Sequence, residues 1–227
     1  MAVALAIIFA IRLRSDGDDG APAATGDTTT ASDAATSSTT APVDSGTDGD
    51  GSTTSVATDA KPTKSLTQAL LTQEDLPAGW TSTGRSSTTA QLCPGQNPTE
   101  KVPAKGADSS SFANGDGGPF VANIVQEFRD EKTARAFVAA SRSGVAACSS
   151  YSQSGVDYRL TVGAVPDVGD EAFGAELVGN GETARIVGRI LYARVGDRVA
   201  TIVFYGTGTG LDSTPAADAL RVVAGRL

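Results

Sequence analysis

The sequence predicts an α+β fold, with an antiparallel sheet of about six strands, helices packed on one side, and the order α-β-β-α-β-β-β-β-α. Two observations carry this prediction. Glycine-containing turns join successive runs of alternating apolar residues, and apolar residues recur at helical spacing in a few separate segments. Hairpin-linked strands with segregated helices are typical of α+β proteins, whereas βαβ folds alternate the two.

The first residues of the domain are expected to be helical. Residues 66–71 predict a short helix, and Thr72 with Asp75 is an N-cap followed by an acidic third position, where another turn begins. The Pro-Ala-Gly stretch 77–79 ends this part, and Trp80 is expected in the core.

Two strands and a long helix follow. Residues 109–114 and 119–128 alternate around a glycine-rich hairpin turn at 115–118. Asp130 is a good N-cap for the helix 130–150. Its core-facing positions recur at helical spacing and are Ala134, Phe137, Val138, Ser141, Val145 and Cys148.

The remainder predicts a meander and a last helix. Asn180-Gly181 and Gly196-Asp197 are hairpin turns, and Thr214-Pro215 begins the helix. The expected strands are 157–165, 172–178, 183–195 and 198–205, and the apolar face of the helix is Ala216, Leu220, Val223 and Leu227.

The N-terminal residues 1–14 are interpreted as an apolar anchor or signal remnant. The run 2–11 is uninterrupted apolar, but as a helix it spans only about 15 Å, half of a bilayer core. Positive charge follows the run at Arg12 and Arg14 instead of preceding it, so we expect the true start upstream of Met1. The alternative is a short apolar tail on a cytoplasmic protein.

Residues 15–65 predict a disordered linker rich in Ser, Thr, Asp, Ala and Gly. This stretch has nine Asp against two Lys and contains no aromatic residue, Leu, Ile or Met. Such a composition cannot bury enough apolar surface to offset the entropy of ordering it. The linker therefore separates the N-terminal segment from a domain at 66–227, either as a stalk or as a tail without a length requirement.

Composition excludes several classes of site. The chain has 227 residues, a formal charge of −8, two cysteines and no histidine. No Ser-His-Asp triad, Cys-His dyad, His-ligated zinc or Cys₄ site can be built from it. We expect no catalytic residue, metal or cofactor, and the acidity argues against a nucleic-acid partner.

Cys93 and Cys148 are expected to form one disulfide outside the cell, because an apolar N-terminus and a Ser/Thr-rich stalk accompany them. The bridge would tie the irregular segment around Cys93 to the end of the long helix. Two buried free thiols in a cytosolic protein are the alternative.

Three further patterns have plain alternatives. Gly206-Thr207-Gly208-Thr209-Gly210 is interpreted as a strand-to-helix connector, because it lacks the third glycine of a dinucleotide fingerprint. The cluster of Asp167, Asp170 and Glu171 suits a carboxylate or calcium site, or a solvated acidic turn. Arg185 and Arg189 share one strand face and are candidate residues for an anionic ligand, or for cross-strand ion pairs.

Five short motifs follow one another along the domain: Leu71 to Trp80, Phe128 to Asp130 leading into Ala134 and Ala136 to Val138, Cys148, Val168 to Ala172, and Arg194 to Asp197. Together they resemble the extracellular sensor-like domain of mycobacterial Ser/Thr protein kinases and related actinobacterial secreted proteins. The resemblance covers about residues 66–227 and carries no ligand-binding residue over. It implies a cell-surface α+β domain with a cleft that binds an unidentified ligand.

The sequence and the resemblance together predict a non-catalytic sensor-like or ligand-binding domain tethered to the actinobacterial cell envelope. Its expected place is the extracellular face of the cell membrane, with the N-terminal segment in the membrane, or outside the cell as a secreted protein. The expected partner is an unknown small molecule or cell-envelope component, held by a sheet face and a cleft between helix 130–150 and the Cys93 segment. The alternative is a structural or protein–protein interaction module without a small-molecule ligand. A third class is a hydrolase that uses carboxylates alone.

Overall fold

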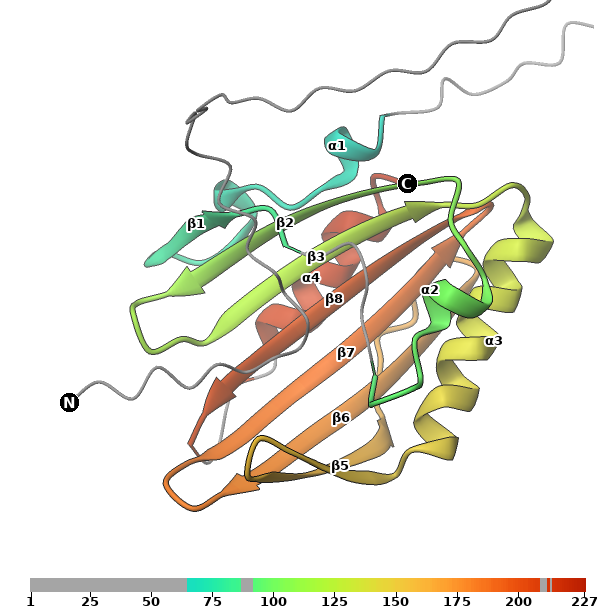
Figure 1. The fold of residues 1–227 in the computed structure, drawn as a ribbon. Coiled ribbons are helices and arrows are strands. Elements are labelled where there is room, and N and C mark those ends of the chain that lie inside the picture. Colours follow the sequence, from blue (N-terminus) through green and yellow to red (C-terminus); the bar gives the residue numbers. More distant parts are fainter. Residues whose placement is uncertain (1–64, 87–91, 209–211, 213) are drawn as a thin grey trace, which may run out of the picture. The chain divides into compact units, whose positions relative to one another are not determined.

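The computed structural model describes residues 65–86, 92–208, 212 and 214–227. The predicted anchor 1–14, and the linker 15–65 apart from Ser65, lie outside these residues. The described chain forms one antiparallel sheet of eight strands in the order β1-β2-β3-β8-β7-β6-β5-β4 (Figure 1). In this part of the chain no helix combines the length and the apolar character that crossing a membrane requires.

The strands are β1 Trp80–Gly84, β2 Gly106–Asn114, β3 Phe120–Glu127, β4 Ser150–Gln153, β5 Val156–Gly163, β6 Glu171–Gly181, β7 Arg185–Val195 and β8 Arg198–Thr207. The helices are α1 Leu66–Ala69, α2 Pro98–Lys101, α3 Glu131–Ala147 and α4 Thr214–Ala224, with a 3-10 helix η1 at Gln73–Asp75.

The prediction of about six strands was short by two. The missed strands, β1 and β4, lie at the two edges of the sheet. Both are short and mostly polar, with four of the five residues of β1 exposed. They are strands because their backbones pair with β2 and β5. An edge strand of this kind needs no alternating apolar pattern, so no such pattern in the sequence predicts it.

The prediction that the helices pack on one side was wrong. α3 packs on a core rich in aromatic residues on one face, whereas α1 and α4 cover the opposite face, where Trp80 belongs to the same apolar cluster (Figure 1). The reason lies in the central strand β8, where the seven residues from Arg198 to Phe204 are all buried. A strand buried at every position is covered on both faces.

The hairpin between β6 and β7 turns two residues later than predicted. Asn180 still pairs with Arg185, and the Gly181 N–H donates to the Ala184 carbonyl at 3.0 Å, which leaves Glu182-Thr183 as the turn. The turn at Gly196-Asp197 lies where the sequence places it, with Gly196 at a φ of 59°.

The predicted disulfide between Cys93 and Cys148 is confirmed, with a Cα–Cα distance of 6.5 Å. Cys148 is the C-cap residue of α3, so the bridge fastens the Cys93 segment to the end of that helix. Next to it, Leu92 is fully buried and lies where a side chain at Gly144 would clash. The absence of a side chain at Gly144 therefore lets the segment approach the helix.

Candidate functional site

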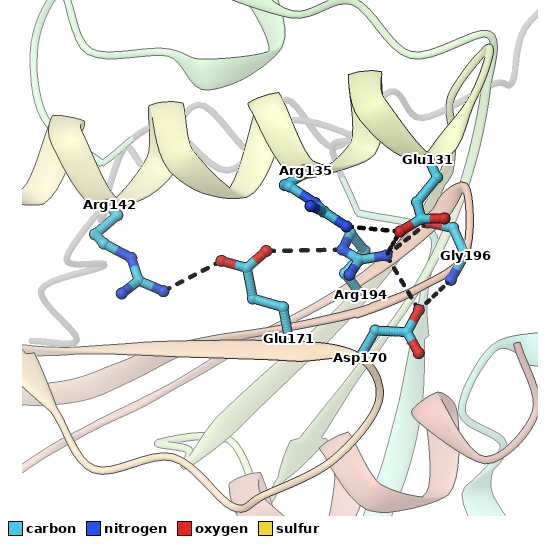
Figure 2. Close-up of polar contacts among 7 residues, drawn as sticks. All are labelled: Glu131, Arg135, Arg142, Asp170, Glu171, Arg194 and Gly196. Carbon is cyan, nitrogen blue, oxygen red and sulfur yellow. Dashed lines mark hydrogen bonds and ion pairs between the residues drawn. The ribbon is translucent and has the colours of Figure 1, made fainter.

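A cluster of charges joins α3 to the sheet around the buried Arg194 (Figure 2). We call Glu131, Asp170, Glu171, Arg194 and Gly196 the Arg194 cluster. The Arg194 guanidinium donates to Asp170 at 3.0 Å, to Glu131 at 3.3 Å and to the Gly196 carbonyl at 3.1 Å. Glu171 lies 3.7 Å from Arg194 on its other side.

Two of the sequence motifs behind the resemblance meet in this cluster. Gly169 has a φ of +68°, and a side chain there would collide with the Arg194 carbonyl. The glycine therefore brings Asp170 against β7, where the Asp170 N–H donates to that carbonyl at 2.7 Å. The Asp170 carboxylate in turn accepts from the Gly196 N–H at 2.7 Å.

The Arg194 cluster is a closed ion-pair network and not an acid–base pair. Glu131 also pairs with Arg135 at 2.7 Å, and Glu171 with Arg142 at 3.4 Å. Each carboxylate thus faces a guanidinium. Figure 2 shows Arg194 lying between Glu171 on one side and Glu131 with Asp170 on the other, while Arg142 lies beyond Glu171; these ion pairs join α3 to the sheet.

Of the three acids predicted to cluster, Asp170 and Glu171 come together, while Asp167 is exposed and outside the network. The sequence reasoning missed Arg194, which is the centre of the site. One pattern points to it: Arg194 follows the apolar run from Ile190 to Ala193 in β7, and a charge buried next to such a run needs a partner.

Arg185 and Arg189 lie on the same face of β7, as predicted. Arg185 is exposed, whereas Arg189 is half-buried, donates to the Ala164 carbonyl and lies 3.8 Å from Glu176 on β6. Arg189 thus ties the loop after β5 to the sheet. Their role toward an anionic ligand stays a prediction.

The glycine-rich stretch predicted as a connector begins at the end of β8, where Gly208 has a φ of +106°. Thr209 and Gly210 lie outside the described residues. Among the residues that are described, no group of three or more Cys, Asp or Glu side chains is arranged to hold a metal ion.

Leu92 packs on α3 beside the Cys93 segment. Leu92, Val145 and Val138 belong to one apolar core with the sheet, and Val102 and Ala104 pack against it. The expectation of a ligand in a cleft edged by helix 130–150 and the Cys93 segment stays a prediction.

An apolar depression lies elsewhere, on the part of the α3-side face formed by β1, β2, β3 and β8. We call it the aromatic hollow; its volume is about 190 Å³, and the lining used below is Thr83, Ser111, Phe120, Ala122 and Tyr205. The Phe120 and Tyr205 rings stack with centroids 5.2 Å apart. Burial raises the pKa of the Tyr205 hydroxyl, so this wall is neutral.

A second depression, of about 280 Å³, lies between the turns that join β4 to β5 and β6 to β7, and it includes Ser154, Gly155 and Glu182. Its lining is mostly turn backbone and small side chains. It offers neither an aromatic surface nor a group of converging charges.

No protein-family model matches the chain. No curated protein matches it either. Among solved structures, it is similar to the extracellular domain of PknH from Mycobacterium tuberculosis, with a TM-score of 0.52 and 14% sequence identity over 71% of this chain and 94% of that chain. The predicted resemblance to the mycobacterial kinase sensor-like domain is thereby confirmed at the level of the fold.

Proposed function

We propose that this chain is a non-catalytic, extracellular sensor-like domain of an actinobacterial cell envelope, tethered through its N-terminal segment or secreted. One observation carries the proposal: the described domain shares its fold with 94% of the PknH extracellular domain.

The disulfide supports the extracellular part of this proposal. Cysteine pairs persist in oxidising compartments and are rare in the cytosol. The Cys93–Cys148 pair fastens an irregular segment to the end of α3, which is a structural role.

The charge arrangement supports the non-catalytic part. The chain has no histidine to act as a base near neutral pH. The cluster around the buried Arg194 pairs each of its carboxylates with an arginine. Such a network stabilises a helix on a sheet, and its carboxylates are occupied by ion pairs.

For a sensor-like domain the aromatic hollow is the candidate ligand site. The alternative, a structural or protein–protein interaction module without a small-molecule ligand, is favoured by the burial of Leu92, next to Cys93, in the core shared with α3. It is also favoured by the hollow's volume of about 190 Å³, below the range of roughly 300–1,000 Å³ of drug-sized ligand pockets.

The location is tested on intact actinobacterial cells producing the full chain with a C-terminal epitope tag. We expect added protease to remove the tag from the cells or from the medium while a cytoplasmic control protein stays intact. Acid-quenched alkylation should leave Cys93 and Cys148 unmodified until a reductant is added. A protected tag or two alkylated cysteines would contradict the proposal.

A further inference from the structure

We propose that the aromatic hollow binds one uncharged pyranose ring of a saccharide. The inference rests on the proposed sensor-like function for its biological meaning, and it names the ligand chemistry of that candidate site.

The size and charge of the hollow limit its ligand. A cavity of about 150 Å³ lined by apolar side chains holds a benzene ring, so about 190 Å³ accommodates one six-membered ring and little more. None of the residues that line the hollow carries a charge. A charged group entering it would lose its hydration without gaining a partner, which disfavours phosphates, carboxylates and amines.

The polar edge of the hollow accepts hydrogen bonds. The Ser111 hydroxyl donates its hydrogen to the Gly84 carbonyl at 3.0 Å, and the Thr83 and Ser111 hydroxyl oxygens lie 2.8 Å apart. The only hydroxyl hydrogen of Ser111 is already used in the bond to Gly84, so in the second contact the Thr83 hydroxyl donates to Ser111. The lone pairs left on Thr83 are therefore acceptors, and a ligand with O–H or N–H groups can donate to them.

The opposite wall is aromatic. Phe120 and Tyr205 stack at an interplanar angle of 23°, and both are only partly buried. The electron-rich face of an aromatic ring attracts the partly positive hydrogens of a C–H group. A pyranose combines an apolar C–H face with hydroxyl donors at its rim. An alkyl chain has no hydrogen-bond donor that could bond to the Thr83 oxygen.

The test is a titration of the full chain with methyl β-D-glucopyranoside, followed by saturation-transfer NMR. A ligand of this size in a shallow site is expected to bind with a Kd of about 1 mM. Phe120→Ala removes the aromatic wall and Thr83→Val removes the acceptor at nearly unchanged volume. Each is expected to weaken binding about fivefold, since one aromatic or hydrogen-bond contact contributes about 1 kcal/mol.

The protein offers a matched control. Tyr151 stacks on Tyr158 at a centroid distance of 4.9 Å on the far edge of the sheet, away from the hollow. Tyr151→Ala therefore removes a stacked aromatic without touching the proposed site, and its Kd should equal that of the unchanged protein. Circular dichroism identifies any variant that fails to fold. If Phe120→Ala fails to fold, Thr83→Val still tests the site, because Thr83 lies at an exposed strand position.

The inference is overturned if no saturable binding occurs at concentrations about tenfold above the expected Kd. It is also overturned if Tyr151→Ala weakens binding as much as Phe120→Ala, or if 4-methylphenol binds and the glycoside does not. If the saccharide does not bind but the tag on cells is accessible to protease, only the saccharide site is contradicted. If the tag is protected from protease, the proposed function is contradicted instead.

Discussion

The two faces of the sheet hold their helices by different means. On one face α3 is fastened by the Cys93–Cys148 bridge and by the Arg194 cluster, in which the arginine side chain is only 4% exposed. On the other face lie the first and last helices, α1 and α4, which Arg226 connects. Its guanidinium donates to Asp75 and to the Leu70 carbonyl. The side chain of Arg226 is 28% exposed and that of Asp75 is 13% exposed.

This difference shows which part of the domain opens first. The stretch before β1 is further held by Asn123, whose amide oxygen accepts from the Leu71 N–H at 3.0 Å, and by Ser110, which donates to the Leu71 carbonyl. Such polar contacts exchange with water, whereas a disulfide does not. We infer that local opening begins at α1 and that α3 stays attached longest.

The largest expected effect comes from the bridge on the α3 side. In the variant carrying Cys93→Ser and Cys148→Ser, the free energy of unfolding should fall by about 4 kcal/mol, because the closed loop of 55 residues no longer restricts the unfolded chain. Urea unfolding measures this loss. Reduction of the unchanged protein should reproduce this loss. A loss below about 1 kcal/mol would show that the bridge is not the main attachment on the α3 side.

A smaller effect is expected at the Arg194 cluster. Arg194→Ala removes a buried guanidinium but leaves carboxylates that are 28–55% exposed and can be rehydrated, so we expect a loss of about 2–3 kcal/mol. The matched control, Arg135→Ala, removes an exposed partner of the same Glu131 and should cost at most about 0.5 kcal/mol. Equal losses would show that burial of Arg194 is unimportant.

On the opposite face Arg226→Ala should cost about 1–2 kcal/mol, since a partly buried, two-pronged ion pair is lost. Hydrogen exchange locates the change: amides of α1 and η1 should exchange faster, while those of α3 keep their protection. Uniform acceleration over both faces would contradict the comparison.

The smallest effect is a pH dependence of the same contact. Burial acts to raise the pKa of Asp75, but hydrogen bonds from Arg226 and Thr72 outweigh it, so the pKa lies below the ordinary value of 3.8. A carboxyl whose pKa is lowered by folding stabilises the fold above its unfolded value, and this stabilisation disappears as the pH falls through the folded pKa.

The advantage of the unchanged protein over Asp75→Asn, below about 1 kcal/mol at neutral pH, should therefore shrink as the pH falls below 3.8. Thermal unfolding of both proteins across this range measures it. An advantage that grows on acidification would show that Asp75 is not ionised in the fold.

The comparison also shows how far the sequence could be interpreted. The helical spacing from Ala134 to Val145, and the hairpin turn at Gly196-Asp197, predicted α3 and the pairing of β7 with β8 correctly. Both depend on local periodicity and turn chemistry. The edge strands β1 and β4 were missed because backbone pairing with a neighbour, and not their own side chains, makes them strands.

By itself, therefore, the sequence determined the α+β class, the cysteine pair, the main elements and the exclusion of histidine chemistry, because composition and short-range spacing carry that information. Only the tertiary structure decided which face each helix covers, that Leu92 packs into the core with α3, and that Asp170 and Glu171 meet Arg194. It also decided that Phe120 and Tyr205 form a hollow. These contacts join residues that are distant in the sequence. They are decided by packing in three dimensions, which local sequence patterns do not record.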